Sequence, residues 1–130
     1  MDIDQSSNKS AASHFIKMYD EGLKLGLYYI EKLFTKHVVC NLHIYKDNHI
    51  DNSEFTGYIA LKEKLFALGI TTLNMKEYCY SSQFTGRNLL LTINGTMLIN
   101  QQPYTFTNTL VLKYINYSYI IVNYILQIFK

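Results

Sequence analysis

Apolar and polar side chains alternate along the last third of the chain in three runs, 89–99, 104–113 and 119–129. The runs are rich in Leu, Ile, Val, Thr and Tyr, which favour β-strands. Between them lie residues 100–103, which include the single proline, and residues 114–118, which contain Asn and Ser. Because these residue types are typical of turns, the pattern predicts three strands joined by two tight turns.

Successive residues of a strand point to opposite faces of its sheet, so each run separates into two faces. One face is apolar or aromatic, and we expect it to pack on helices. Together with the helix residues that should meet it, this face forms the predicted core, which consists of Phe15, Tyr19, Leu61, Leu65, Leu91, Ile93, Phe106, Leu110, Val122, Tyr124 and Leu126.

The opposite face of the three strands mixes apolar side chains with neutral polar ones. A face that contacts water normally carries charged side chains, and this face carries almost none. We therefore predict that it is a dimer interface, covered by a partner. The predicted interface residues are Thr92, Asn94, Thr107, Thr109, Ile121, Asn123, Ile125 and Gln127.

The middle of the chain contains the other expected elements. Apolar residues recur at helical spacing between residues 11 and 34, where Gly22 and Gly26 predict either a break into two helices or a close backbone contact. Residues 38–45 form a short β-branched run, which indicates a first strand at the edge of the sheet. A polar loop is expected over residues 46–53.

A second helix is predicted over residues 58–68, with Gly69 just beyond its end as the terminator. Residues 71–84 alternate loosely and predict a further strand, which a hairpin turn joins to the strands of the last third. This order predicts an α+β fold with helices on one face of a mostly antiparallel sheet. We expect residues 1–10 to be a disordered tail and residues 11–130 to form one domain.

Composition and charge narrow the classes of function. Of the 130 residues, 48% are hydrophobic and 17% are charged, as in a globular protein. The formal net charge of +2 is too small to indicate direct binding to nucleic acid or to a membrane surface. All ten acidic residues lie at or before Glu77, so the predicted sheet is short of the groups that usually perform acid–base catalysis.

The polar, acidic start of the chain does not have the pattern of a signal peptide. No apolar run reaches the roughly 20 residues that cross a membrane as a helix. We therefore expect a protein of the nucleus or cytoplasm in which Cys40 and Cys79 are reduced thiols.

A few residues offer catalytic chemistry. His14 is the best histidine candidate for a general base in a cavity between helices and sheet, although a surface position explains it better. Tyr78 and Tyr124 could line such a cavity, but core packing is the simpler interpretation. We predict that the protein is not an enzyme and has no catalytic residue and no cofactor.

Two patterns invite a metal interpretation. On one strand His37 and His43 would lie roughly 20 Å apart at about 3.3 Å per residue, and Cys40 would point to the other face, so these three cannot enclose zinc. Alternating polar residues between Asp47 and Ser53 suggest a calcium loop but lack the glycine that such a loop needs. We predict no metal site.

The order of elements and several short motifs resemble the nuclear transport factor 2-like family over residues 12–129. The resemblance implies a cone-like, curved antiparallel sheet packed on about three helices, also called a cystatin-like roll, which often dimerises through the outer face of the sheet. The motifs that carry it are Phe15-Ile-x-x-Tyr19, Phe55-x-Gly57 followed by Glu63-Lys64-Leu65, Phe106-x-Asn108-x-Leu110-x-Leu112 and Tyr119-x-x-x-Asn123.

The resemblance also implies a role in nucleocytoplasmic transport. Thr92 and Ile125 stand at the family's dimer contacts. Nuclear transport factor 2 itself binds GDP-loaded Ran through acidic residues, and His43 and the segment 100–102 stand in their place without a carboxylate. The resemblance therefore implies the small subunit of the mRNA-export heterodimer, which pairs with a homologous domain of a larger receptor and engages phenylalanine-glycine repeats of nucleoporins.

Two alternatives stay open within the same fold. One is a homodimeric carrier that imports Ran-GDP, in which the partner is a second copy of the chain. The other is a small-molecule-binding protein of the isomerase or dehydratase type. The transport interpretation places the protein in the nucleus, in the cytoplasm and at the nuclear pore and envelope.

Overall fold

The computed structural model describes residues 5–130. Two helices and two strands come first: α1 (Gln5–Leu25), the 3-10 helix η1 (Leu27–Leu33), β1 (Phe34–Lys46) and β2 (His49–Thr56). The chain continues with α2 (Tyr58–Ala67), β3 (Leu73–Thr85), β4 (Asn88–Ile99), β5 (Gln102–Ile115) and β6 (Ser118–Phe129). No helix in the described range is long and apolar enough to cross a membrane.

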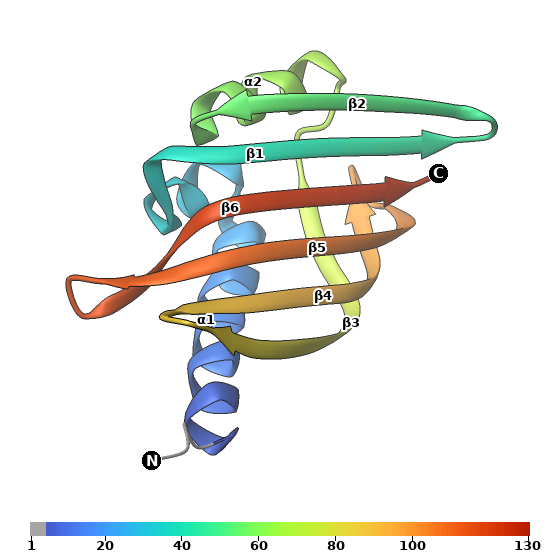
Figure 1. Ribbon diagram of the computed structural model, residues 1–130. Helices are drawn as coiled ribbons and strands as arrows, with labels where there is room; N and C mark the ends of the chain where they lie inside the picture. The colour runs from blue at the N-terminus through green and yellow to red at the C-terminus, as the bar shows by residue number, and fades with distance from the viewer. Residues whose placement is uncertain (1–4) are drawn as a thin grey trace.

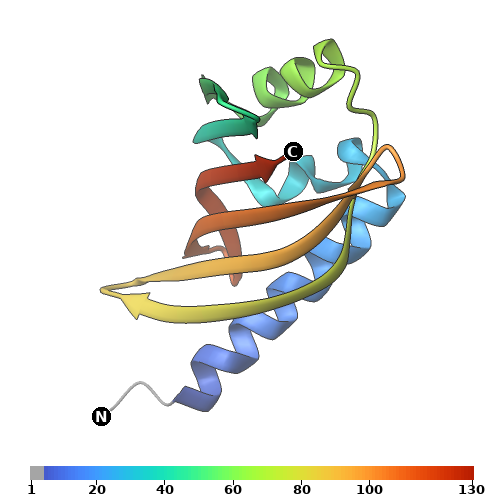
Figure 2. The same ribbon diagram turned by 90° about the vertical axis from the view of Figure 1, so that its right-hand side faces the viewer.

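The strands form one curved sheet in the order β2-β1-β6-β5-β4-β3 (Figure 1). Neighbouring strands are antiparallel except β1 and β6, which run parallel. Helix α1 crosses one face of the sheet, and α2 lies against β1 and β2 (Figure 2). The predicted α+β fold is therefore confirmed, with one parallel pair in an otherwise antiparallel sheet.

The core lies between the helices and the concave face of the sheet. Every predicted core residue except Val122 is buried. Val122 is half-buried because the β5–β6 register shifts by one residue: Val111 lies opposite Asn123, whereas Leu112 lies opposite Ile121. The shift is a β-bulge, and it exchanges the two faces of the strand beyond it.

Ile121 is consequently a core residue, with none of its surface exposed. The prediction that it belongs to the dimer interface is wrong. Strict alternation along the whole of β6 would have placed it on the face away from the helices, but the extra residue in the bulge turns its side chain inward.

The start of the chain also differs from the prediction. Helix α1 begins at Gln5, so residues 5–10, expected in a disordered tail, form its first turns. The rest of that tail, residues 1–4, lies outside the described residues. The predicted break is present, since α1 ends at Leu25 and η1 begins at Leu27. The predicted close contact is present too, because Ile30 of η1 packs against Gly22.

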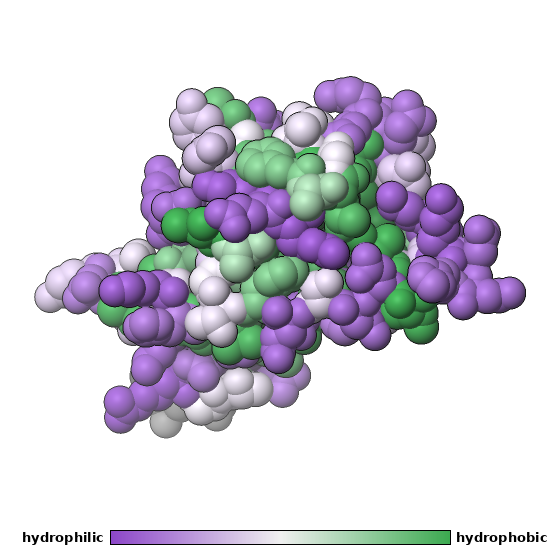
Figure 3. All heavy atoms as spheres, turned by 90° about the horizontal axis from the view of Figure 1, so that it is seen from above, coloured by the Kyte–Doolittle hydropathy of each residue, from purple (hydrophilic) through white to green (hydrophobic). Residues whose placement is uncertain are grey.

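The polar loop predicted for residues 46–53 is largely a strand. β2 pairs with β1 along its whole length, so β1 is an inner strand and the prediction that it forms an edge is wrong. Asp51 of β2 lies 4.0 Å from the Lys64 ammonium of α2, which explains why this strand contains charge on its inner side. The tip of the β1–β2 hairpin is hydrophilic (Figure 3).

Candidate functional site

The face of the sheet turned away from the helices, called the outer face here, is built from alternate residues that the strand register aligns in rows. One row contains Cys79, Asn94, Thr107, Gln127, His43 and Asn52. The next row contains Ser81, Thr92, Thr109, Ile125, Asn41 and Glu54. Glu54, at the β2 edge, is the one carboxylate in these two rows, which contain no Lys or Arg.

The structure brings the predicted interface residues together on the outer face, apart from Ile121. Asn94 and Asn123 are exposed, and the others are half-buried: Thr92, Thr107, Thr109, Ile125 and Gln127. The sequence missed Asn41, His43 and Asn52, which continue the rows across β1 and β2. Alternation along residues 38–45 was a usable signal for the first two, whereas Asn52 required recognition of β2.

Polar side chains of the outer face are held by contacts with each other. The Thr107 hydroxyl donates to Asn94 Oδ1 at 3.2 Å, and Gln127 Nε2 donates to the Tyr45 hydroxyl at 3.3 Å. His43 Nδ1 and Asn52 Oδ1 are also hydrogen-bonded. Ordering these side chains within the sheet lowers the entropy that a binding partner would have to remove.

One end of the outer face is apolar. The rings of Tyr45 and Phe129 stack with their centroids 4.9 Å apart and their planes 9° from parallel. Ile50 lies opposite Tyr45 and is 55% exposed. The outer face therefore combines a neutral polar middle with an aromatic and aliphatic end, which suits contact with another protein better than contact with water.

The interior of the cone contains a buried polar cluster formed by Tyr19 of α1, Asn108 of β5 and Tyr124 of β6. The Tyr19 hydroxyl donates to Asn108 Oδ1 at 2.6 Å and lies 2.6 Å from the Tyr124 hydroxyl. Asn108 Nδ2 donates to the Ile125 carbonyl oxygen at 2.9 Å. The sequence placed both tyrosines in the core, but it did not predict this network.

Burial raises the pKa of Tyr19 and of Tyr124 well above the ordinary value of a phenol. Both hydroxyls are therefore protonated at neutral pH. Because the Tyr19 hydroxyl donates its proton to Asn108 Oδ1, its oxygen accepts a hydrogen bond from the Tyr124 hydroxyl. The carboxylate of Asp20 lies elsewhere on α1, where its Oδ2 accepts from the Tyr78 hydroxyl at 3.4 Å and lies 3.7 Å from the Lys24 ammonium.

His14 lies outside this interior. It is exposed on α1 and lines a surface groove of about 740 Å³ together with Phe15, Met18, Tyr114 and Tyr119. The surface position that the sequence favoured for His14 is confirmed.

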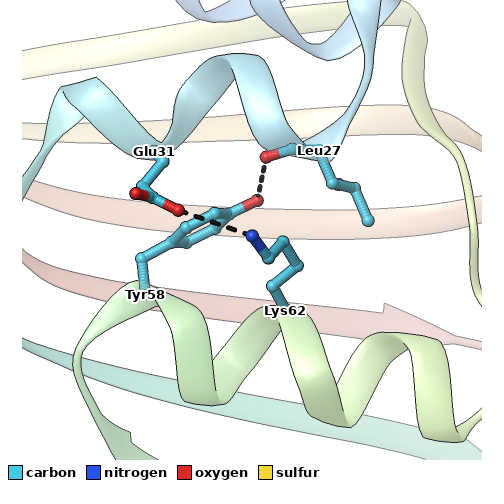
Figure 4. Close-up of polar contacts among 4 residues, drawn as sticks. All are labelled: Leu27, Glu31, Tyr58 and Lys62. Atoms are coloured by element: carbon cyan, nitrogen blue, oxygen red, sulfur yellow. Dashed lines mark hydrogen bonds and ion pairs between the residues drawn. The ribbon is translucent and has the colours of Figure 1, made fainter.

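A buried lysine fastens α2 to η1 (Figure 4). The Lys62 ammonium lies 3.4 Å from Glu31 Oε1. It also lies 3.8 Å from the centroid of the Tyr28 ring. Beside it, the Tyr58 hydroxyl donates to the Leu27 carbonyl oxygen at 2.6 Å. A cation over an aromatic ring is attracted by its negative face, so Tyr28 partly replaces the water that Lys62 has lost. No pattern in the sequence predicted this contact.

The cysteine and histidines of β1 do not form a metal centre. Cys40 is buried on the inner side of the strand, where burial raises the pKa of its thiol to about 12. His43 lies on the outer face, so the two point in opposite directions, as predicted. Residues 5–130 contain no group of three or more His, Cys, Asp or Glu side chains that could hold a metal ion.

The sequence matches no protein-family model and no curated protein sequence. Among solved structures, the fold is similar to that of a chain in the C. albicans Mtr2–Mex67 M domain complex, with a TM-score of 0.74 and 12% identity over 94% of each chain. At this identity the likeness concerns the fold alone.

Two bacterial structures are similar as well. One is a candidate dehydratase of the NTF2-like family from Streptomyces avermitilis, with a TM-score of 0.65 and 9% identity over 96% of this chain and 98% of that chain. The other is a candidate ketosteroid isomerase from Parabacteroides distasonis ATCC 8503, with a TM-score of 0.63 and 12% identity over 90% of this chain and 86% of that chain.

These likenesses correct the prediction that the chain is not an enzyme, because the same fold occurs in structures that carry enzyme names. The shortage of acidic residues in the sheet does not exclude catalysis, since α1 and other segments before β3 also contain ionisable groups. What the likenesses establish is the architecture. The chain has the nuclear transport factor 2-like fold.

Proposed function

We propose that the chain is the small subunit of an mRNA-export receptor and pairs through its outer face with a homologous nuclear transport factor 2-like domain of a larger partner. The observation that carries the proposal is the outer face, whose aligned rows of Thr, Asn, Gln and Ile contain a single carboxylate. Interface cores are depleted of charged residues in this way.

A solved complex supports a heterodimer. One chain of the C. albicans Mtr2–Mex67 M domain complex is similar in fold to this chain over 94% of each chain. As part of the same proposal, the assembled heterodimer engages phenylalanine-glycine repeats of nucleoporins and moves between nucleus and cytoplasm at the nuclear pore.

Carriage of GDP-bound Ran is the weaker alternative, because the residues in the corresponding positions have no carboxylate, and two of them, His43 and Asn100, are hydrogen-bonded within the chain. Asn100 Oδ1 accepts from the Thr71 amide at 2.9 Å, and its Nδ2 donates to the Gly69 carbonyl oxygen at 2.6 Å. His43 is hydrogen-bonded to Asn52. Asn100 therefore fastens the segment before β3 and has no carboxylate to offer a basic partner.

The replacement Ile125→Glu tests the proposed interface. Ile125 lies in the middle of the outer face and is half-buried, so a carboxylate there would have to lose its water when a partner docks. We expect binding to the partner's nuclear transport factor 2-like domain to weaken at least about a hundredfold, because an unpaired buried charge costs several kcal/mol. Ile59→Glu is the matched control, since Ile59 is a 55% exposed isoleucine on α2.

The measurement is capture from an extract of the source cells with the tagged chain, followed by titration calorimetry with the purified partner domain. The wild type and Ile59→Glu should capture a protein that contains a nuclear transport factor 2-like domain, whereas Ile125→Glu should not. Capture of no such domain, or equal affinity of the two variants, would refute the proposal.

A further inference from the structure

A second surface groove, of about 760 Å³, lies where η1, the start of β1 and the start of α2 meet. Two buried rings line it, Phe34 and Tyr58, which stack with their centroids 4.4 Å apart. Tyr28 and Tyr29 of η1 line it as well, and more than half of each of these side chains is exposed. Small-molecule sites have volumes of about 300–1,000 Å³ and mainly apolar and aromatic walls. The groove therefore has the size and the lining of a ligand site.

The groove has an excess of positive charge. Lys32 and Lys36 line it, both are exposed, and neither forms an ion pair within residues 5–130. Glu31 is the one carboxylate in the described lining, and the Lys62 ammonium neutralises it at 3.4 Å. Two positive charges remain without a partner. Because a cleft with one sign of charge attracts ions of the other sign, the ligand that complements this groove is an anion.

Uncharged hydrogen-bond donors lie beside these lysines. Thr35 and Thr56 line the groove, and within residues 5–130 neither hydroxyl has a hydrogen-bond partner. Lysine ammonium groups and threonine hydroxyls are typical partners of phosphate oxygens. A phosphate offers more oxygen atoms to such a set of donors than a carboxylate does, so the groove favours a phosphate group.

We propose that this groove binds a nucleoside monophosphate. Its phosphate lies at Lys32 and Lys36, and its base stacks on the exposed rings of η1. The Lys62 ammonium covers one face of the Tyr28 ring at 3.8 Å, which leaves the other face of that ring and the Tyr29 ring for the base. Every nucleobase has a flat aromatic face that stacks on tyrosine, so one ligand matches both the rings and the charge.

The ligand site is separate from the proposed interface with the larger partner. None of the predicted interface residues lines the groove, which is formed by η1, α2 and the ends of β1 and β2 next to them. The assignment therefore goes beyond the proposed heterodimer, and either can fail without the other.

Titration of the isotope-labelled full chain with adenosine monophosphate, followed by nuclear magnetic resonance, tests the assignment. We expect saturable shifts of the amide signals of Thr35, Lys36 and Gly57, which line the groove. Adenosine lacks the anion and inorganic phosphate lacks the ring. Each should therefore bind at least about tenfold more weakly than adenosine monophosphate, because each loses either the charged hydrogen bonds or the stacking.

Three variants separate the contributions of charge and stacking. Lys32→Gln combined with Lys36→Gln should lower the affinity for adenosine monophosphate at least about tenfold and leave the affinity for adenosine unchanged. Lys17→Gln combined with Lys113→Gln is the matched control, because it removes two exposed lysines outside the groove and should keep the wild-type affinity. Tyr29→Ala should weaken the binding of adenosine and of adenosine monophosphate alike.

The proposal would be overturned by the absence of saturable shifts at millimolar adenosine monophosphate, or by equal losses in the two double variants. Inorganic phosphate that binds as tightly as the nucleotide would reduce the groove to an anion site and also overturn it. Tighter binding of O-phosphotyrosine would assign the groove to a phosphorylated protein instead. Since all the substituted side chains are exposed, circular dichroism should show unchanged folding in every variant.

Discussion

Position 95 has no room for a side chain. A Cβ atom on Gly95 would lie 2.0 Å from the carbonyl oxygen of Glu77 and 2.7 Å from the Cα of Tyr78, both in the neighbouring strand β3. The β3–β4 register also shifts between Met75 and Glu77, and such a bulge increases the local twist of a sheet. The close approach at Gly95 therefore belongs to the bend that brings β3 under α1.

Gly95→Ala should be strongly destabilising, because the methyl group would collide with backbone that cannot move without breaking the β3–β4 pairing. We expect the free energy of unfolding to fall by about 3 kcal/mol or more, as for other overpacking and strain effects. Urea denaturation followed by circular dichroism measures it. Gly69→Ala is the control, since Gly69 also has a positive φ of 78° but nothing within 4 Å, and it should lose only about 1–2 kcal/mol.

Tyr19→Phe should also destabilise the chain, although it removes a single oxygen atom. Without this hydroxyl, Asn108 Oδ1 and the Tyr124 hydroxyl lose a partner inside the core. An unsatisfied buried polar group costs about 1–3 kcal/mol, and we expect a loss in that range on urea denaturation. Tyr29→Phe, at a side chain that is 56% exposed, should change stability by less than about 0.5 kcal/mol. Equal effects of the two replacements would contradict the role given to the cluster.

At the scale of elements, the pattern of alternation predicted most of the sheet. It assigned inner and outer faces correctly for β4 and β5, because each of these strands keeps a regular alternation through the segment covered by helices. It failed at Ile121, since nothing in the residue types around Val122 marks a bulge. The pattern also missed β2, because the inward-facing Asp51 is typical of a loop when only the sequence is considered. In the fold, Lys64 of α2 balances the charge of this aspartate.

Contacts between elements that are far apart in the sequence could not be predicted from it. The Tyr19–Asn108 hydrogen bond joins residues 89 positions apart, and no local pattern indicates that their side chains meet. The burial of Lys62 could not be predicted either, because a lysine on a helix is usually solvated. In the fold, η1 turns back over α2 and covers this lysine with Tyr28.

Lys62 should contribute to the α2–η1 contact through packing of its carbon chain more than through its charge. Lys62→Met keeps a long unbranched side chain and leaves Glu31, which is 48% exposed, in water, so we expect a loss of about 1 kcal/mol at most. Lys62→Ala removes the packing as well and should lose about 2 kcal/mol or more. Thermal unfolding of both variants measures the difference, and equal losses would show that the charge dominates.

At the scale of the whole molecule, buried tyrosines make stability depend on alkaline pH. Burial raises the pKa values of Tyr19, Tyr58 and Tyr124 above the value near 10 that they have in the unfolded chain. Their contribution to stability is therefore complete below pH 10. It decreases as the pH rises above 10, because the unfolded chain then loses protons that the folded chain retains.

We expect the free energy of unfolding to fall above pH 10 by up to about 1.4 kcal/mol per pH unit for each of these tyrosines. Urea denaturation at several values between pH 8 and pH 11 measures the slope. Tyr124→Phe should have a smaller slope above pH 10 than the wild type, even though it is less stable at pH 8. An identical slope in the variant would show that Tyr124 does not remain protonated in the folded state.

The parallel pairing of β1 with β6 has a consequence for folding during synthesis. β1 pairs with two strands. One of them, β2, follows it directly in the sequence, whereas the other, β6, is the last strand of the described residues. During synthesis, β1 and β2 therefore cannot join the rest of the sheet until β6 has emerged from the ribosome. Such a long-range closure slows folding and leaves one side of β1 exposed in the meantime, so nascent chains that stall before residue 118 should be strong clients of chaperones.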